Sequence, residues 1–264
     1  MKKKHVLGAA IALTLAAAGG ISAFGYNYYN TVSAAEVSDT SSSDVSLDDL
    51  KVLTFLGDSI TYGWDTDKAY EYFLGEYLDA DTVYNYGQGG TTLSDGADYL
   101  SKDNMIERAA ILPADSDLIF VLGGSNDWAY NVELGEMGDT DPTTFYGALD
   151  TLMSYLLENY PDAEIIFATP LQRIDWLTKY PHLTNEDGVS ENSSGHTLEE
   201  YANAVLEVAE KNGITVIDLF HAEETDFTSD TDYTLYWSDG LHPNAYGDEL
   251  MADYIYEQLL ALYA

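Results

Sequence analysis

Short apolar runs alternate along the chain with longer segments in which apolar residues recur at the helical period. The short runs predict buried strands at Val52–Leu56, Thr82–Tyr86, Leu118–Leu122, Ile165–Ala168 and Thr215–Ile217. The longer segments predict helices at Ala69–Leu78, Asn104–Ile111, Pro142–Asn159, His196–Asn212 and Ala245–Leu260. This alternation predicts an α/β domain whose parallel sheet is covered by helices on both faces.

Capping residues, proline and glycine mark several of the predicted boundaries. Asp141-Pro142 is typical of a helix start, because Asp can cap a helix and Pro is favoured at the first helical position. Tyr160-Pro161 and Asn212-Gly213 are typical of helix ends. The long connection Pro170–Gly195 is interpreted either as a wall of a substrate pocket or as a surface insertion without a ligand role.

The first 50 residues differ in pattern from the rest of the chain. The basic head Lys2–His5 precedes the apolar stretch Val6–Ala18 and a run of small residues, which is the layout of a secretory signal. The uncharged run is near the lower length for a membrane span, so an uncleaved anchor is the alternative. We expect a signal peptide or anchor (1–35), a Ser- and Asp-rich flexible linker (36–50) and one folded domain (51–264) of a secreted protein.

Charge and composition exclude several classes of function. The chain carries 46 acidic and 10 basic residues, and its formal charge of −36 repels nucleic acid and anionic membrane surfaces. We therefore expect no nucleic-acid partner, and membrane contact only through the N-terminal segment. Cysteine is absent, which rules out disulfides, thiolate catalysis and cysteine-based zinc sites.

The first predicted strand runs directly into Gly57-Asp58-Ser59. A serine at a strand-to-helix turn can project its hydroxyl over the sheet edge as a nucleophile, or it can simply cap the helix. No Gly-x-Ser-x-Gly pentapeptide occurs in the chain, which argues against the ordinary α/β-hydrolase class. The carboxyl ends of parallel strands share one sheet edge, so the loops after the other strands should meet this serine.

The loops after the second and third predicted strands contain groups that can donate hydrogen bonds. Asn85–Thr92 is rich in glycine, so its backbone N–H groups can approach a ligand, but it completes neither a dinucleotide fingerprint nor a phosphate loop. Gly123–Trp128 contains Asn126, whose side-chain amide can either donate to a developing oxyanion or make an ordinary turn hydrogen bond. Asp127 is interpreted as a structural carboxylate.

The segment Ser238–Asn244 contains an Asp and a His three residues apart, Asp239 and His242. On a turn, this spacing lets the carboxylate orient the imidazole, which can then accept a proton from a serine. The other histidines lack the second His of a zinc helix, so we expect neither a metal nor another cofactor.

Four short motifs in this order resemble the SGNH subgroup of the GDSL-type esterases and lipases. Ile60 stands where the family name has Leu, and Ser125 stands where Thr is commoner. The motifs span nearly all of residues 51–264, and they are Gly57-Asp58-Ser59-Ile60, Gly87-Gln88-Gly89-Gly90-Thr91, Gly123-Gly124-Ser125-Asn126-Asp127 and Asp239-Gly240-Leu241-His242-Pro243.

The resemblance implies a flavodoxin-like three-layer α/β/α sandwich with a central, mostly parallel five-stranded sheet, and ester hydrolysis without a metal. It makes Ser59 the nucleophile, His242 the base and Asp239 the group that orients the imidazole. It also assigns the oxyanion hole to the backbone N–H groups of Ser59 and Gly90 and to the side chain of Asn126. Gly90 is chosen over its neighbouring glycine because it directly precedes the Thr-Thr pair.

A secreted serine esterase that removes acetyl or other short acyl groups from polysaccharide or small-molecule esters is the function we expect. Aromatic rings near the predicted site can stack on sugars or simply pack the core. The candidates for substrate contact are Trp64, Trp128, Arg173 and Trp176. The alternatives are a lipase or acyltransferase of the same fold, and a carbohydrate-binding module without catalytic activity.

Overall fold

The computed structural model describes residues 45–96, 104–174, 190–226 and 233–263. The predicted signal or anchor lies outside the described residues, and so does most of the predicted linker. In the part of the chain that is described, no helix has the length and apolarity needed to cross a membrane.

Five parallel strands form one sheet, as the sequence predicts. Their spatial order is β2-β1-β3-β4-β5. Their bounds agree with the predicted ones to within one residue at each end: β1 (Val52–Gly57), β2 (Thr82–Gly87), β3 (Leu118–Leu122), β4 (Glu164–Ala168) and β5 (Thr215–Ile217). The register aligns Leu53 of β1 with Leu118 of β3, and Leu118 with Glu164 of β4.

The central strands β1, β3 and β4 bury side chains on both faces of the sheet, and their sequences are therefore nearly continuous apolar runs. In β3, Ile119 and Val121 enter one core while Phe120 and Leu122 enter the other. All five β3 residues are buried. Strand β2 is an edge strand, and three of its six residues are exposed.

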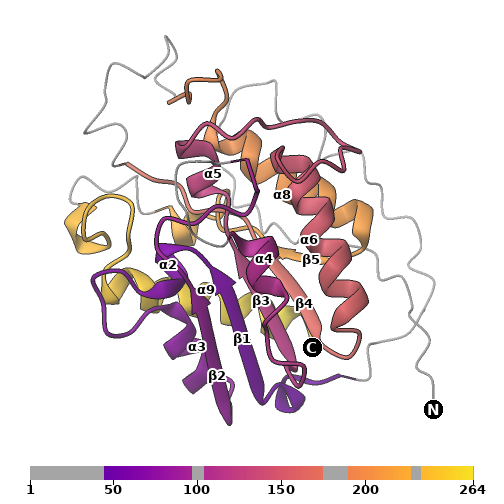
Figure 1. Ribbon diagram of the computed structural model, residues 1–264. Coiled ribbons are helices and arrows are strands. Elements are labelled where there is room, and N and C mark those ends of the chain that lie inside the picture. The colour runs from indigo at the N-terminus through magenta and orange to yellow at the C-terminus, as the bar shows by residue number, and fades with distance from the viewer. Residues whose placement is uncertain (1–44, 97–103, 175–189, 227–232, 264) are drawn as a thin grey trace, which may run out of the picture.

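Helices cover both faces and give the three-layer α/β/α sandwich (Figure 1). One layer contains α4 (Met105–Ala109), α6 (Phe145–Asn159) and α8 (Leu198–Asn212), whose buried residues share a core with Ile119. The opposite layer contains α3 (Tyr70–Tyr77) and α9 (Ala245–Leu262), which share a core with Phe120. Figure 1 shows α9 behind the sheet and α6 in front of it.

The structure corrects the predicted start of α6. The helix begins at Phe145, because the Thr144 side chain accepts the Gly147 N–H and caps it. Asp141 instead caps a separate turn, where its carboxylate accepts from the Thr143 N–H at 3.0 Å. The Asp-Pro pair therefore starts a turn before the helix and not the helix itself.

Two short helices were not among the predicted elements. They are α2 (Ser59–Tyr62) and α5 (Ser125–Ala129), which follow β1 and β3. Helices of four or five residues are too short to show a hydrophobic period.

Ser59 begins α2 at the topological switch point of the sheet. The chain leaves β1 for its neighbour β2 on one side, then crosses to β3 on the other side. Ligands of open parallel sheets bind in the crevice at such a point, outside the carboxyl ends of the strands. The strand order therefore indicates a ligand site at the loops after β1, β2 and β3.

Candidate active site

Beyond the carboxyl end of β1, Ser59 is the first residue of the short helix α2. The carboxylate of Asp58 accepts the Ile60 N–H at 2.9 Å and caps α2. Ser59 is 6% exposed, so its hydroxyl lies just below the protein surface. The Asp of the Gly-Asp-Ser motif thus has a local structural task, which is to start the helix that carries the serine.

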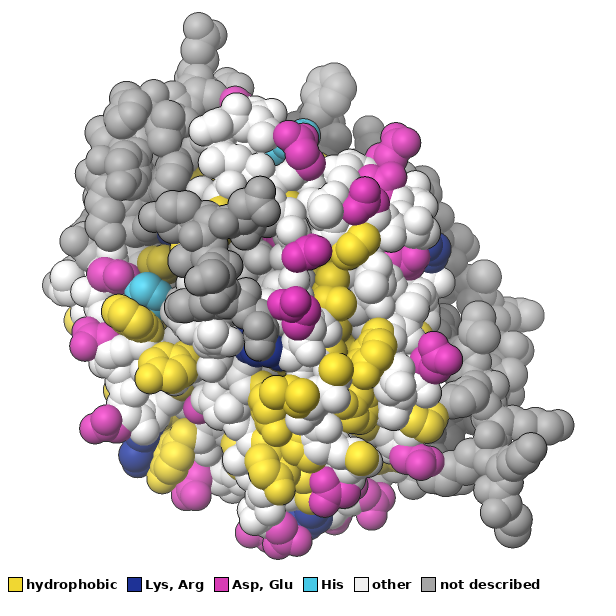
Figure 2. Space-filling view, viewed as in Figure 1, with side chains coloured by type: hydrophobic (Ala, Val, Ile, Leu, Met, Phe, Trp, Pro, Cys, Tyr) yellow, Lys and Arg dark blue, Asp and Glu magenta, His cyan; other side chains and the backbone are white. Residues whose placement is uncertain are grey.

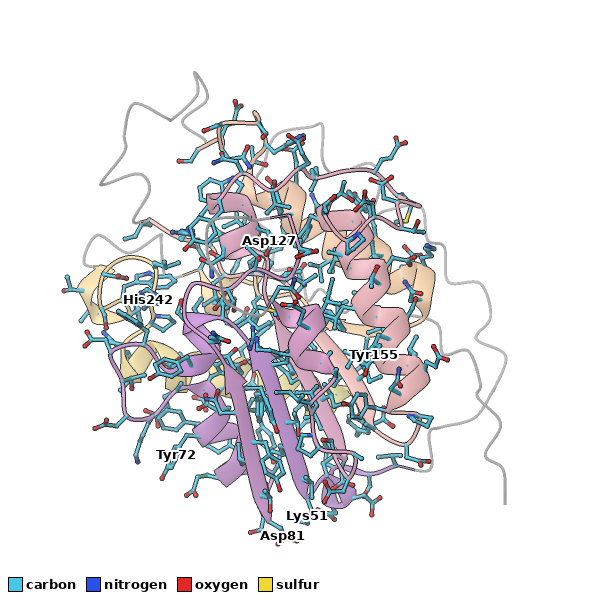
Figure 3. All side chains as sticks on the ribbon, in the orientation of Figure 1. Lys51, Tyr72, Asp81, Asp127, Tyr155 and His242 are labelled. Atoms are coloured by element: carbon cyan, nitrogen blue, oxygen red, sulfur yellow. The ribbon has the colours of Figure 1, made fainter. Side chains whose placement is uncertain are left out.

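His242 lies against Ser59 although 183 residues separate them in the chain. Its Nε2 is 2.9 Å from the Ser59 Oγ, and its Nδ1 is 3.0 Å from the Asp239 Oδ2. The other Asp239 oxygen accepts the backbone N–H groups of Leu241 and His242. Figure 3 places His242 on the left side of the view, well away from Lys51 and Asp81 at the bottom.

Several backbone contacts hold the turn that contains Asp239 and His242 in place. Trp237, which is 2% exposed, forms a β-bridge with Pro243. The Ile174 N–H, beyond the end of β4, donates to the Gly240 carbonyl at 2.9 Å. The imidazole therefore has little freedom to leave the position where it meets Ser59.

The second and third motifs meet each other beside this group. The Asn126 side chain donates to the Thr91 carbonyl at 2.9 Å. An amide has two N–H groups and this bond uses one of them. Gly90 has a φ of 76°, a left-handed conformation that side-chain-bearing residues rarely adopt. The structure thus joins Gly90 and Asn126 through Thr91.

Asp127 fixes the loop that contains Gly90, which agrees with its interpretation as a structural carboxylate. Its two oxygens accept the backbone N–H groups of Leu93 and Ser94 at 2.9 and 3.0 Å. Burial raises the pKa of this carboxyl, and the two backbone hydrogen bonds oppose that change. The loop after β2 is therefore anchored to the helix after β3.

Arg108 is a buried residue beside the candidate site that the sequence pattern did not single out. Its guanidinium is buried and donates to the Gly57 carbonyl at 3.0 Å, to the Thr91 Oγ1 at 2.8 Å and to the Tyr86 carbonyl. It therefore ties the carboxyl ends of β1 and β2 to the loop of the second motif. A signal was present, because the chain has only two arginines, and the other, Arg173, also lies near the site.

Two carboxyl groups near His242, those of Asp58 and Asp239, have pKa values shifted in opposite directions. Burial raises the pKa of Asp58 to about 6, although the Ile60 N–H and the charge of His242 oppose the rise. Burial also acts on Asp239, but the N–H groups of His242 and Leu241 outweigh it and lower the pKa. Asp239 therefore stays ionised through the neutral range and faces the imidazole as an anion.

The four predicted substrate contacts have different positions. The Trp64 side chain is 52% exposed and its ring is stacked on the ring of His242. Arg173 donates to the Ser125 Oγ at 2.9 Å and lies over the Trp128 ring. Trp128 is buried, so we no longer propose it as a substrate contact. Trp176 lies outside the described residues, as does most of Pro170–Gly195.

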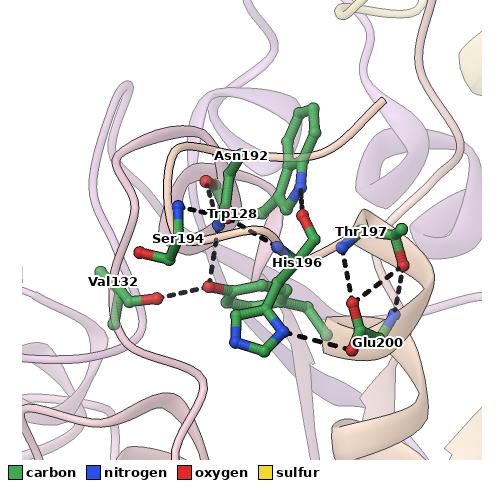
Figure 4. A network of polar contacts seen from close by, with 8 residues as sticks. Trp128, Val132, Asn192, Ser194, His196, Thr197 and Glu200 are labelled. Carbon is green, nitrogen blue, oxygen red and sulfur yellow. Dashed lines mark hydrogen bonds and ion pairs between the residues drawn. The ribbon is translucent and has the colours of Figure 1, made fainter. Parts of the chain in front are cut away.

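Trp128 instead belongs to a network of hydrogen bonds between α5 and the segment before α8 (Figure 4). Its indole N–H donates to the His196 carbonyl at 2.9 Å. The Asn192 amide donates to the Trp128 carbonyl and to the Tyr201 hydroxyl, which itself donates to the Val132 carbonyl. The network joins α5, which carries Asn126, to the segment that leads into α8.

Chemically, the arrangement can activate a hydroxyl and stabilise a negative charge beside it. A serine hydroxyl is a weak nucleophile until an adjacent base accepts its proton. The contacts of His242 with Ser59 and Asp239 meet this requirement. Among the described residues, no group of three or more His, Cys, Asp or Glu side chains is placed to hold a metal ion, and the metal-free reaction stays a prediction.

Known proteins resemble this chain in sequence and in fold. The sequence matches the GDSL-like Lipase/Acylhydrolase family over residues 55–250. A Lactobacillus plantarum protein of solved structure is 28% identical, with a TM-score of 0.68 over 80% of this chain and 97% of its own. Another solved structure is 30% identical, with a TM-score of 0.71 over 82% of this chain and 99% of its own.

A more distant likeness shows the fold alone. The lipase/acylhydrolase from Enterococcus faecalis is 21% identical, with a TM-score of 0.52 over 80% of this chain and 96% of its own. No curated protein matches the sequence closely enough to count as a relative. The family match covers more than half of the chain and all four motifs lie within its bounds, so the chain belongs to the GDSL-like lipase/acylhydrolase family.

Proposed function

We propose that this protein is a serine ester hydrolase that works through an acyl-serine intermediate. The observation that carries the proposal is the continuous contact from Asp239 through His242 to Ser59, with distances of 3.0 and 2.9 Å. In this arrangement the carboxylate holds the imidazole with Nε2 towards the hydroxyl, which is the condition for proton transfer to the base.

The first half of the reaction follows from these positions. The Ser59 Oγ attacks the ester carbonyl carbon while His242 Nε2 accepts the hydroxyl proton. The resulting oxyanion is stabilised by the backbone N–H groups of Ser59 and Gly90 and by the Asn126 side chain. The C–O bond to the alcohol then breaks, and His242 returns the proton to the departing oxygen.

The second half releases the acid and restores the serine. A water molecule attacks the acyl-Ser59 carbonyl, and His242 accepts its proton. The second tetrahedral oxyanion uses the same donors and collapses to the carboxylic acid. His242 returns the proton to the Ser59 Oγ.

The proposed substrates are acetyl or other short acyl esters of carbohydrates or small alcohols. A formal charge of −36 repels polyanionic substrates, so a neutral ester fits the protein better. The half-exposed Trp64 ring beside His242 offers an apolar face of the kind that packs on sugar rings. A screen of acetylated sugars, short-chain esters and long-chain esters tests this choice, and a preference for long acyl chains would replace it with a lipase.

The mechanism is tested with p-nitrophenyl acetate and a serine-directed fluorophosphonate probe. The wild-type protein should hydrolyse the ester and take up one probe molecule, located by mass spectrometry on Ser59. The Ser59→Ala variant should do neither and should unfold at the wild-type temperature. Labelling of a different residue, or near-normal turnover by Ser59→Ala, would refute the assignment.

A matched control is available at the opposite end of the sheet. Ser116 is also a buried serine, and its hydroxyl contacts the Thr54 hydroxyl at 2.7 Å just before β3 begins. Ser116→Ala should keep both hydrolysis and labelling. If wild-type protein neither turns over nor labels, the chain is better described as a binding module that has kept the fold.

We also propose that the protein is exported. The support is the basic head, apolar stretch and small residues within residues 1–35. Expression of the full chain and of a chain lacking these residues tests the proposal, because only the former should place esterase activity outside the cell.

A further inference from the structure

Trp64 is a large aromatic residue that stays half exposed beside the proposed catalytic residues. Its side chain is 52% exposed, while its neighbour His242 is only 9% exposed. The two rings are stacked, with centroids 5.7 Å apart and planes inclined by 29°. One part of the indole therefore covers the imidazole, and the remainder faces solvent.

The position of Trp64 follows from the way α2 ends. Gly63, with a φ of 80°, donates its N–H to the Ile60 carbonyl, and the Trp64 N–H donates to the Ser59 carbonyl at 3.1 Å. These two bonds make a Schellman motif, which commonly brings the side chain after the glycine back over the residue three positions before the helix end. In α2 that residue is Ser59, so the backbone itself fixes the indole near the serine.

Gly89 lies between the indole and the serine. A methyl group added at Gly89 would lie 3.6 and 3.7 Å from two ring carbons of Trp64 and 3.7 Å from the Ser59 Cβ. These are ordinary van der Waals separations, so the space can hold a methyl group without a clash. The indole, Gly89 and Ser59 therefore border one narrow space beside the serine.

The chemistry of the proposed reaction tells which part of an ester this space faces. His242 must return its proton to the alcohol oxygen, so the alcohol departs next to the imidazole. A ring stacked on that imidazole borders the alcohol and not the acyl chain. Figure 3 places His242 close to the outside of the molecule, and Figure 2, in the same orientation, shows hydrophobic side chains at the surface there.

We propose that Trp64 is a specificity-determining residue that contacts the alcohol part of the ester and favours alcohols with a flat or ring-shaped apolar face, such as sugars and aryl alcohols. This inference rests on the proposed function, because it uses the direction in which the alcohol leaves. It assigns the acyl part of the ester to the other side of Ser59, away from the indole.

Two matched sets of esters test the inference. The first keeps the acetyl group and varies the alcohol across an acetylated sugar, 2-naphthol, p-nitrophenol and ethanol. The second keeps p-nitrophenol and varies the acyl group across acetate, butyrate and octanoate. We expect Trp64→Ala to lower kcat/KM for the aryl and sugar acetates roughly tenfold relative to ethyl acetate, through KM, because one aromatic contact is worth about 1.4 kcal/mol.

Three further variants make the result specific. Trp64→Phe keeps an apolar ring and should restore most of the preference. Gly89→Ala fills the narrow space and should discriminate against the bulkiest alcohols. Tyr72→Ala removes another exposed aromatic ring, which Figure 3 places well away from His242, and it should leave both ester sets unchanged.

The outcomes separate this inference from the proposed function. An equal loss for all alcohols after Trp64→Ala, or an altered preference among the acyl groups, would overturn the inference. Fluorophosphonate labelling of Ser59 in Trp64→Ala measures the reactivity of the serine without any ester alcohol. If neither the wild type nor this variant labels, the proposed function itself has failed.

Discussion

The turns Asp239–His242 and Asp218–His221 share one local geometry. In each, one carboxylate oxygen accepts the N–H groups of the His and of the residue before it, and the other lies within 3.0 Å of the His Nδ1. They differ at the far side of the ring. Nε2 of His242 meets the Ser59 hydroxyl, whereas Nε2 of His221 is 3.6 Å from a Glu199 carboxylate oxygen.

This difference at Nε2 gives the two histidines different chemistry. Burial lowers the pKa of His221, but hydrogen bonds to Asp218 and Glu199 and their charges outweigh it and raise the pKa to about 9. His221 therefore holds its proton at neutral pH and joins two acids as a cation. At Nε2 of His242 the partner is a hydroxyl, which, unlike a carboxylate, adds no negative charge. The Asp-x-x-His turn orients the imidazole in both cases, and the group that faces Nε2 determines what the imidazole can do.

Exchanging each histidine for alanine should separate the two turns most strongly. His242→Ala removes the proposed base and should lower kcat for p-nitrophenyl acetate by roughly 10⁴-fold or more, as loss of a triad member does in serine hydrolases. His221→Ala should leave kcat within about threefold of the wild type. Steady-state kinetics with thermal unfolding as a folding control would measure both. Equal losses of kcat would show that the partner of Nε2 does not distinguish the two histidines.

A second prediction tests the oxyanion donors beside the Asp239–His242 turn. Asn126→Ala removes a side-chain donor and should lower kcat by roughly 10²- to 10³-fold while KM changes little, because the interaction strengthens only in the transition state. Kinetics on p-nitrophenyl acetate would measure the two constants. A rise in KM with unchanged kcat would instead assign Asn126 to substrate binding.

A third prediction concerns pH and separates the turns by stability. Because the folded-state pKa of His221 is about 9, above its ordinary 6.5, its ion pairs stabilise the protein fully below pH 6.5 and cease to do so as pH rises through 9. The loss should be on the order of 2 kcal/mol, after allowance for the partly exposed imidazole. Urea unfolding at pH 6 and pH 10 would measure it.

The matched variant for this measurement is His221→Gln, which keeps a polar side chain but cannot be charged. Between pH 6 and pH 10, the free energy of unfolding of His221→Gln should change less than that of the wild type. The difference between the two changes should equal the wild-type loss, on the order of 2 kcal/mol. An identical pH dependence in the two proteins would contradict the ion-pair assignment. Catalytic activity should not follow this transition, because His221 does not contact Ser59 in the structure.

The sequence predicts the strands and the meeting of the motifs well, for a physical reason. A strand such as β3 is buried on both faces, so its apolar run is nearly unbroken and its ends are clear. The carboxyl ends of parallel strands share one edge of the sheet. Ser59 and Asn126 follow the neighbouring strands β1 and β3, so the strand order alone places them at the same edge. The family resemblance then supplies the roles that geometry alone leaves open.

What the sequence does not predict depends on contacts between distant residues. Arg108 looks like an ordinary charge on an amphipathic helix until its three acceptors, on β1, β2 and the Thr91 loop, are seen. Trp128 lies two residues after Asn126, yet its burial is decided by α8 and the segment before it. At Nε2 the Asp218–His221 turn differs from its counterpart through Glu199, which lies on α8.

The separation of 183 residues between Ser59 and His242 makes the site a late product of folding. Contacts between such distant residues must overcome the loop-closure entropy of nearly the whole domain, and they form slowly in comparison with local helices. The Asp239–His242 turn, by contrast, closes over three residues. During synthesis Ser59 emerges 183 residues before His242, so their contact can form only after the intervening chain has been made. The contact between Ser59 and His242 is for this reason a direct reporter of native topology in this protein.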